Sequence, residues 1–366
     1  MSDLKAFEFE ADIPVLYPHN HASNLHVLDN GDILCVWFSG SREGKPDISI
    51  MCSRLKKGEQ DWSKPTVLSD DFERSEQNPI LFQNTNGELW LIYTAQNAVH
   101  QESSVVRYRV SNDDGHTWSE IKTLFDKPGT FVRHKPVILD NGELVLPAYY
   151  SLKSRTGFLG NDFSVIKISH DHGKTWTEHE IKGSKGLVHM SIVPDHTGHL
   201  VGFFRSRKAD YIYRSISKDG GRTWTTPTQT ELMNNNSSIQ ATRLKNGKLA
   251  IVFNNINAQL APPKENRPPW FDKSDMDKVG VDKNVKEQAS IWGVIRAPLT
   301  VALSNDDGET WNYKKNIMTK EDVSEIHPEF SYPSIKQTDE GSIHITFTYL
   351  RKYIKHVVVT EDWIKN

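Results

Sequence analysis

Apolar and polar residues alternate in short runs along most of the chain. In VVRYRVS, residues 105–111, polar side chains separate Val106, Tyr108 and Val110. A period of two is that of a β-strand with one buried face, because successive side chains of a strand point to opposite sides. Helical periodicity is almost absent between these runs. The pattern therefore predicts an all-β protein.

Six strongly apolar runs each begin at a turn that contains a glycine. They occupy residues 30–39, 87–95, 142–150, 198–206, 247–255 and 341–349. Strand-rich units that repeat every roughly 45–60 residues are typical of propellers. We therefore predict a six-bladed β-propeller that forms one domain over residues 1–366. The fifth unit is longer because a polar stretch rich in proline and lysine, at about 256–292, is inserted as a loop.

An octet of the form S-x-D-x-G-x-T-W recurs between these runs. It stands at residues 111–118, 169–176, 217–224 and 304–311, with a worn copy at 53–62. The aspartate can accept hydrogen bonds from turn amides, and the glycine can take a positive φ. The threonine and tryptophan are expected to pack the turn onto a neighbouring repeat. These aspartates are therefore predicted to be structural and not catalytic.

Charge and composition exclude several classes of function. The chain has 44 Lys and Arg against 47 Asp and Glu, a net charge of −3. It therefore lacks the excess of positive charge that is typical of proteins that bind nucleic acid or an anionic membrane. No apolar run is long enough to span a bilayer, and the N-terminus lacks the pattern of a signal peptide. The only cysteines are Cys35 and Cys52. We expect a reduced, cytoplasmic protein without a cofactor, and no sequence feature indicates its oligomeric state.

The four octets on a six-unit β pattern resemble the sialidase superfamily, in which the octet is called the Asp box. The resemblance covers nearly the whole chain and implies the sialidase-like propeller fold. It leaves the function open, because propellers with Asp boxes include lyases, glycosidases and binding modules.

Sialidases bind the substrate carboxylate with three arginines, and the resemblance places two of them here. Arg296 stands before the last Asp box in IRAPLTV, and Arg205 ends a strand in GFFRSR, with Arg207 as the alternative. The position of the remaining arginine, ten residues before Gly31, holds His21. The glutamate that braces this arginine should stand sixteen residues after Tyr332, where the chain has Thr348. Both charges are absent together, which indicates a remodelled subsite.

Tyr332 matches the sialidase nucleophile. The glutamate that activates it in sialidases corresponds to His189, sixteen residues before Arg205. A lone histidine in an apolar run such as GLVHMSIV is ordinarily a core residue, but this position favours a catalytic role. Asp47, five residues after Arg42, matches the sialidase acid, although a charged hairpin residue is an equal interpretation.

Other polar residues are assigned to the surroundings of the site. We assign substrate-positioning or structural roles to Arg42 and to Arg133 and His134, which lie early in blade three where a strand would open toward the axis. Asn236 and Gln240 receive the same assignment because they occupy the region where sialidases contact the sugar. We interpret Arg351, Tyr353, Lys355 and His356 as structural residues of an edge strand. The pair of histidines in HNH, residues 19–21, lacks a third ligand nearby, so we assign no metal site.

These residues suit β-elimination at a uronic acid better than sialidase hydrolysis. Elimination needs cations for the carboxylate, a base for the C5 proton and an acid for the leaving oxygen. Arg205 and Arg296 would serve the first need, and His189, His21 and Tyr332 would share the others. Further stretches, among them GTFVRHKPVILDNGELVLP, GLVHMSIV and WGVIRAPLTVALS, look like a branch of sialidase-like proteins close to rhamnose–α-1,4-glucuronate lyases. We therefore expect an enzyme that cleaves a terminal bond of an acidic oligosaccharide.

Two alternatives stay open. The first is an exo-sialidase or another glycoside hydrolase that uses Tyr332 and Asp47. The second is a sugar-binding propeller that has lost catalysis.

Overall fold

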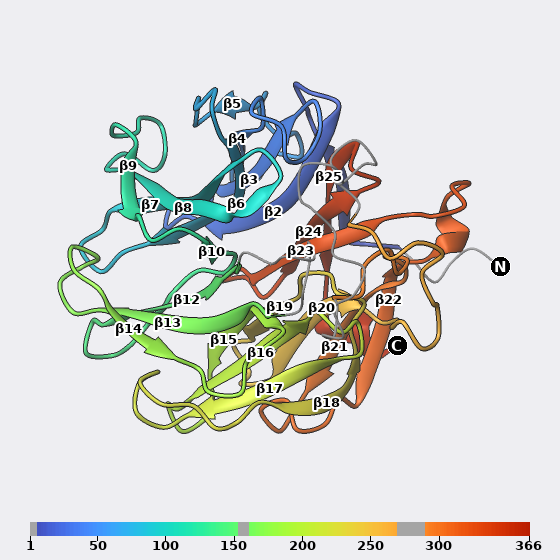
Figure 1. Cartoon of the computed structure of the whole chain (residues 1–366). Helices are drawn as coiled ribbons and strands as arrows, with labels where there is room; N and C mark the ends of the chain where they lie inside the picture. The colour runs from blue at the N-terminus through green and yellow to red at the C-terminus, as the bar shows by residue number, and fades with distance from the viewer. Residues whose placement is uncertain (1–5, 153–160, 269–289) are drawn as a thin grey trace.

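The structure, a computed structural model, describes residues 6–152, 161–268 and 290–366. Six antiparallel sheets, which we call blades 1 to 6, follow one another around a common centre (Figure 1). The predicted all-β, six-bladed propeller is confirmed. Each of the six apolar runs forms the second strand of its blade, counted outward from the centre.

The strands follow the chain in order within each blade. Blade 1 consists of β2 (His19–Val27), β3 (Ile33–Gly40), β4 (Ser49–Leu55) and β5 (Thr66–Val67). Blade 2 consists of β6 (Ser75–Gln83), β7 (Leu89–Asn97), β8 (His100–Ser111) and β9 (Lys122–Phe125). Blade 3 consists of β10 (Thr130–Val132), β11 (Val137–Ile138), β12 (Leu144–Tyr150), β13 (Phe163–Ser169) and β14 (Thr177–Glu180).

The second half of the ring repeats this arrangement. Blade 4 consists of β15 (Leu187–Pro194), β16 (Leu200–Ser206), β17 (Tyr211–Ser217) and β18 (Thr228–Met233). Blade 5 consists of β19 (Gln240–Arg243), β20 (Leu249–Asn254), β21 (Leu299–Ser304) and β22 (Tyr313–Met318). Blade 6 consists of β23 (Phe330–Gln337), β24 (Ile343–Tyr349), β25 (Tyr353–Val359) and, as its outer strand, β1 (Phe9–Ile13). The described part of the chain also contains the short helices η1 (Lys320–Asp322) and α2 (Glu361–Lys365).

Strand β1 closes the ring, because it joins the last blade from the opposite end of the chain. It pairs antiparallel with β25, from Phe9 opposite Val358 to Ile13 opposite Ile354. Strand β25 therefore lies between β24 and β1, and the prediction that it is an edge strand was wrong. Arg351 precedes β25, in the hairpin that follows β24.

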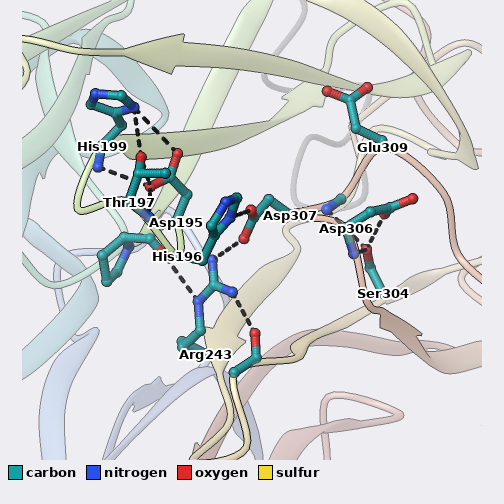
Figure 2. A network of polar contacts seen from close by, with 12 residues as sticks. Asp195, His196, Thr197, His199, Arg243, Ser304, Asp306, Asp307 and Glu309 are labelled. Atoms are coloured by element: carbon teal, nitrogen blue, oxygen red, sulfur yellow. Dashed lines mark hydrogen bonds and ion pairs between the residues drawn. The ribbon is translucent and has the colours of Figure 1, made fainter.

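The Asp boxes form the turns between the third and fourth strands of blades 2 to 5, and the worn copy forms the same turn in blade 1. In the box of blade 5, Asp306 accepts hydrogen bonds from the amide and hydroxyl of Thr310, at 2.9 and 2.6 Å, and from Ser304. Figure 2 shows this box beside a turn of blade 4. Arg243 donates to Asp307 and to the carbonyl of Pro194, so the box is tied to the neighbouring blade.

The glycine of each full box packs against the preceding blade. A Cβ on Gly308 would lie 2.4 Å from Cζ of Phe203 in blade 4, and one on Gly173 would lie 2.8 Å from Trp90 in blade 2. Both glycines have a positive φ. The box thus needs glycine for its turn and for blade-to-blade packing, which supports the structural role predicted for its aspartate.

The predicted insertion lies between β20 and β21, and residues 269–289 of it are outside the described part. Its described end is attached to blade 4, because the amide of Ile291 donates to the carbonyl of Arg207 at 2.8 Å. No helix in the described part of the chain has the length and apolar character that a membrane span requires.

We expect Gly308→Ala to lower the free energy of unfolding by about 2–4 kcal/mol, because it combines an unfavourable φ with a clash at Phe203. Gly247→Ala is the matched control, since Gly247 has a similar φ and nothing lies within 4 Å of its Cβ position. Its loss should be about 1 kcal/mol. Urea denaturation measures both. Equal losses would show that the box glycine is required for its turn alone.

Candidate functional site

Backbone irregularities on the inner strands shape one end of the propeller. Strands β2, β6, β15 and β23 each contain a register shift, at which Ala22, Asn78, His189 and Tyr332 take a positive φ. The values are 49° for His189 and 51° for Tyr332. Bulky residues rarely adopt this conformation, and such bulges often re-aim a side chain at a functional site. Here Asn78, His189 and Tyr332 line one pocket.

Arg205 connects the two residues predicted to act together. Its Nη1 donates to the phenol oxygen of Tyr332 at 2.7 Å and lies 3.4 Å from Nδ1 of His189. The rings of His189 and Tyr332 are 5.6 Å apart between centroids. The structure thus brings the predicted pair together, with a guanidinium between the two side chains.

This contact also fixes the proton of His189. A guanidinium only donates, so Nδ1 accepts and the neutral ring carries its proton on Nε2. That nitrogen lies 3.2 Å from the hydroxyl of Tyr149. Burial and the charge of Arg205 hold the pKa of His189 well below its ordinary value, so the ring is neutral near pH 7.

His21 and Thr348 occupy the positions of a sialidase arginine and its glutamate, and the structure places them in contact. Nδ1 of His21 is 2.9 Å from the hydroxyl of Thr348, which also accepts from the amide of Ala22. The His21 ring is fully buried, 4.2 Å from the Tyr332 ring between centroids. Burial and the charge of Arg351 lower its pKa well below the ordinary value. The two residues that replace the arginine and glutamate of the sialidase pattern therefore contact each other without an ion pair between them.

Three guanidinium groups surround the ring of Tyr332. Those of Arg133, Arg205 and Arg296 lie 5.3, 5.6 and 5.4 Å from its centroid. Burial lowers the pKa of Arg133 and of Arg205 to about 10, so both stay protonated near pH 7. In the described part of the chain, neither Arg133 nor Arg205 forms an ion pair with a carboxylate, and Nη2 of Arg205 is buried without a hydrogen-bond partner. The site therefore attracts a negatively charged group.

Arg207 and Arg296 are each paired with a carboxylate of the protein, so they are less available than Arg205 to bind an anionic ligand. Arg207 donates to Asp162 at 2.9 Å, and its guanidinium carbon lies 4.9 Å from the Trp292 ring. Arg296 donates to Glu329 at 2.6 Å. Of the two alternatives for the blade 4 arginine, Arg205 is the one that contacts Tyr332.

A charged chain that the sequence did not reveal lies beside this site. Glu329 accepts from Arg296 and from Arg351, and Arg351 also donates to Glu43. Burial opposes ionisation of Glu329, but the charges of Arg296 and Arg351 outweigh it and lower its pKa. Arg351 therefore takes part in the polar surroundings of the site and is not only a strand residue.

Several predicted residues make contacts to the protein itself. Arg133 donates to the hydroxyl of Ser238 and to the carbonyls of Ser23, Tyr332 and Pro333, and Gln240 accepts from the amide of Ile335 at 2.7 Å. Asn236 accepts from Nε of Arg205 at 2.8 Å and donates to Ile291. These contacts position the arginines and the inner strands.

The other predicted residues lie at the margin of the site or below it. Asp47 is exposed, and its carboxylate accepts from the amide and hydroxyl of Ser41 at 3.0 and 2.9 Å. This is the hairpin role that was the alternative to an acid. Arg42 is half-buried and contributes to the low pKa of His19, and His134 is buried beside Arg133.

Several residues that line the pocket were not predicted from the sequence, among them Trp292, Tyr149 and Glu43. Trp292 comes from the end of the insertion, Tyr149 from blade 3 and Glu43 from the loop after β3. The position of Glu43 beside Arg42 and Asp47 in SREGKPD was the one available signal. Within the described residues, no cluster of three His, Cys, Asp or Glu side chains could hold a metal ion.

The comparisons with known proteins agree with this architecture. The BNR repeat-like domain family matches residues 31–345. The chain belongs to this family. The six blades and their Asp-box turns agree with this match. No curated protein sequence matches the chain.

Solved structures with the same fold are distant in sequence. A Hadza microbial sialidase, Hz136, superposes with a TM-score of 0.70 at 16% identity, over 95% of this chain and 67% of that one. A protein of unknown function from Dyadobacter fermentans gives 0.71 at 14%, over 96% and 98%. The intramolecular trans-sialidase of Ruminococcus gnavus gives 0.66 at 14%, over 97% and 99%. At these identities the likeness concerns the fold.

We expect the free energy of unfolding to fall as the pH drops from about 6.5 to about 4. The pKa of His19 is lowered to about 3 by burial and Arg351, and those of His21 and His189 are also lowered. The unfolded chain thus binds more protons in this window, which costs about 1.4 kcal/mol per pH unit for each such histidine. His189→Gln should reduce the slope by about that amount in urea denaturation at several pH values.

The exposed His116, in an Asp-box turn, supplies the control variant His116→Gln. It should keep the wild-type slope. A wild-type slope in His189→Gln as well would show that His189 takes up its proton in the folded protein.

Proposed function

We propose that this protein is a carbohydrate-active enzyme that cleaves a terminal glycosidic bond of a uronate-containing oligosaccharide by β-elimination. The observation that carries the proposal is the environment of Tyr332. Its phenol receives a hydrogen bond from Arg205, neutral His189 and His21 lie beside its ring, and no carboxylate in the described part of the chain hydrogen-bonds it. A membrane, a nucleic acid or a cofactor plays no part in this proposal.

The reaction divides among these groups as follows. A base removes the proton on C5, the electron pair forms the C4=C5 bond, and the C4–O4 bond breaks as O4 takes a proton from an acid. Negative charge develops on the C5 carbon and the carboxylate, where buried cations stabilise it. Arg205, with its unpartnered Nη2, is the cation best placed to bind that carboxylate.

Tyr332, His189 and His21 are the candidates for base and acid. A neutral imidazole can accept a proton near pH 7, and a phenol can donate one. Tyr332 and His189 both contact the guanidinium of Arg205, through the phenol oxygen and Nδ1. His21 approaches Tyr332 from blade 1, and its Nε2 is buried without a hydrogen-bond partner.

Hydrolysis by a sialidase mechanism is the second candidate, favoured by the fold and by the position of Tyr332. A tyrosine nucleophile needs a neighbouring base and a separate acid. The residue aligned with that acid, Asp47, is exposed and accepts two hydrogen bonds from Ser41. These contacts favour elimination over hydrolysis. A sugar-binding propeller without catalysis would keep the pocket and release no product.

We expect incubation with a rhamnosyl-glucuronate oligosaccharide to produce an unsaturated uronate, detected by its ultraviolet absorbance. Tyr332→Phe and His189→Ala should lower the rate about 10²–10⁴-fold, because each removes a group that handles a proton. Tyr313→Phe, at an exposed tyrosine of β22, is the matched control and should keep the wild-type rate.

The products separate the alternatives. Free rhamnose without the ultraviolet signal would establish hydrolysis and make Asp47→Asn the next variant. Binding of the oligosaccharide without any product would identify a sugar-binding propeller. Release of sialic acid from a panel of sialosides would contradict the uronate proposal.

A further inference from the structure

One carboxylate faces the pocket that contains Tyr332, His189 and Arg205. Among the described residues that line this pocket, Glu43 is the one acidic side chain, and it is 6% exposed. It comes from blade 1, whereas Arg205 and Arg207 come from blade 4. The pocket therefore presents an acidic group and basic groups from different blades.

Glu43 is held in place by a chain of alternating charges. Nη1 of Arg351 lies 2.5 Å from Oε2 of Glu43, and Nε of Arg351 donates to Glu329 at 2.9 Å. Glu329 in turn accepts from Arg296. Because Arg351 donates to Glu43, this side chain serves as an acceptor, and a carboxylate has room for further hydrogen bonds.

The hairpin that carries Arg351 is fixed on both sides. The carbonyl of Arg351 accepts from the amide of Asn20 at 2.8 Å, and the amide of Leu350 donates to the carbonyl of Glu329 at 2.8 Å. Leu350 and Arg351 both have a positive φ, which bends the chain tightly after β24. The backbone at Arg351 is thus anchored between blades 1 and 6 by contacts that do not involve Glu43.

The loop that carries Glu43 is closed by Asp47. The carboxylate of Asp47 binds the amide and hydroxyl of Ser41, and the amide of Lys45 donates to the carbonyl of Arg42 at 3.1 Å. A Cβ on Gly40 would lie 2.6 Å from the carbonyl oxygen of Asp47, so the two ends of the loop are in close contact. Asp47 therefore shapes the loop from its exposed side, while Glu43 is buried at the pocket.

We infer that Glu43 is a specificity-determining residue that accepts a hydrogen bond from a hydroxyl group of the bound sugar. This inference rests on the proposed function for the nature of the ligand. A substrate carboxylate is repelled by Glu43 and attracted by Arg205, so the acidic sugar enters with its carboxylate toward blade 4 and a hydroxyl toward blade 1. Arg351 acts through Glu43 as a positioning residue.

Calorimetric binding of the rhamnosyl-glucuronate oligosaccharide and its singly deoxygenated analogues tests this inference. Glu43→Gln should weaken binding of the parent compound about 10–100-fold, the range for a hydrogen bond to a charged group. With the wild type, the analogue that lacks the hydroxyl bound by Glu43 should bind more weakly than the parent compound by the same factor. With Glu43→Gln, this analogue and the parent compound should bind equally tightly. Arg351→Met should weaken binding similarly, and the double variant should lose no more than Glu43→Gln.

Controls separate this result from a loss of structure. Glu59→Gln changes an exposed carboxylate in the turn between β4 and β5 and should bind as the wild type does. Glu43→Asp keeps the charge and should bind more tightly than Glu43→Gln. Thermal unfolding of each variant shows whether the fold is intact.

Two outcomes overturn the inference, and they differ in what else fails. If the wild type cleaves the oligosaccharide and Glu43→Gln binds the parent and every analogue as tightly as the wild type does, the inference fails and the proposed function stands. If the wild type neither binds nor cleaves any uronate-containing sugar, the proposed function fails and the inference with it.

Discussion

The convergence of six inner strands on one axis is the constraint on which the rest of this structure depends, and Arg133 occupies that axis. Its side chain is 1% exposed and reaches from blade 3 to carbonyl oxygens of blades 1 and 6 and to a hydroxyl of blade 5. Burying a guanidinium is unfavourable unless its donors are paired, and the acceptors of Nε and Nη2 offset part of that cost, while Nη1 is buried without a hydrogen-bond partner. One of the carbonyls belongs to Tyr332, so Arg133 also fixes the backbone that aims the phenol at the pocket.

The charged residues of this site stand at other positions than the sialidase pattern predicts. Where the sialidase pattern leads one to expect an arginine and a glutamate, His21 and Thr348 form a neutral contact. Charges appear instead one hairpin away, where Arg351 lies between Glu329 and Glu43. A pocket that keeps Arg205 and loses this ion pair still attracts an acid but surrounds it differently. The difference lies in the surroundings of Tyr332, while the Asp boxes form their turns in blades 2 to 5.

The fold could be predicted because its information is local and repeated. Each Asp box forms its own turn with a Ser, an Asp, a Gly and a Thr that lie within seven residues, as Ser304 and Thr310 show. The positions of His189, Tyr332, Arg205 and His21 followed from spacings that the sialidase resemblance supplies, and the structure brings these residues together. How each of them acts in the reaction stays a prediction.

The remainder of the site depends on contacts between distant segments. Glu43 and Arg351 are 308 residues apart, and no local pattern signals that they meet. Trp292 reaches the site from an insertion that has no repeat to count from. Arg351 was assigned to a strand edge because its neighbours alternate, whereas its left-handed backbone places it in the preceding hairpin. Alternation identifies strands, but it does not show where a hairpin projects.

The ring of blades is covalently continuous except where β1 meets β25. At that junction the repeated motif is also weakest, because nothing lies within 4 Å of a Cβ on Gly58, in the worn box of blade 1. Phe9 pairs with Val358 and Ile13 with Ile354, so the outward ends of the two strands leave the ladder on the same side. A mechanical force that pulls these ends apart would separate the strands one residue pair at a time. The ring is therefore closed by one pair of strands, β1 and β25, and tension on their ends breaks the ladder by unzipping and not by shear.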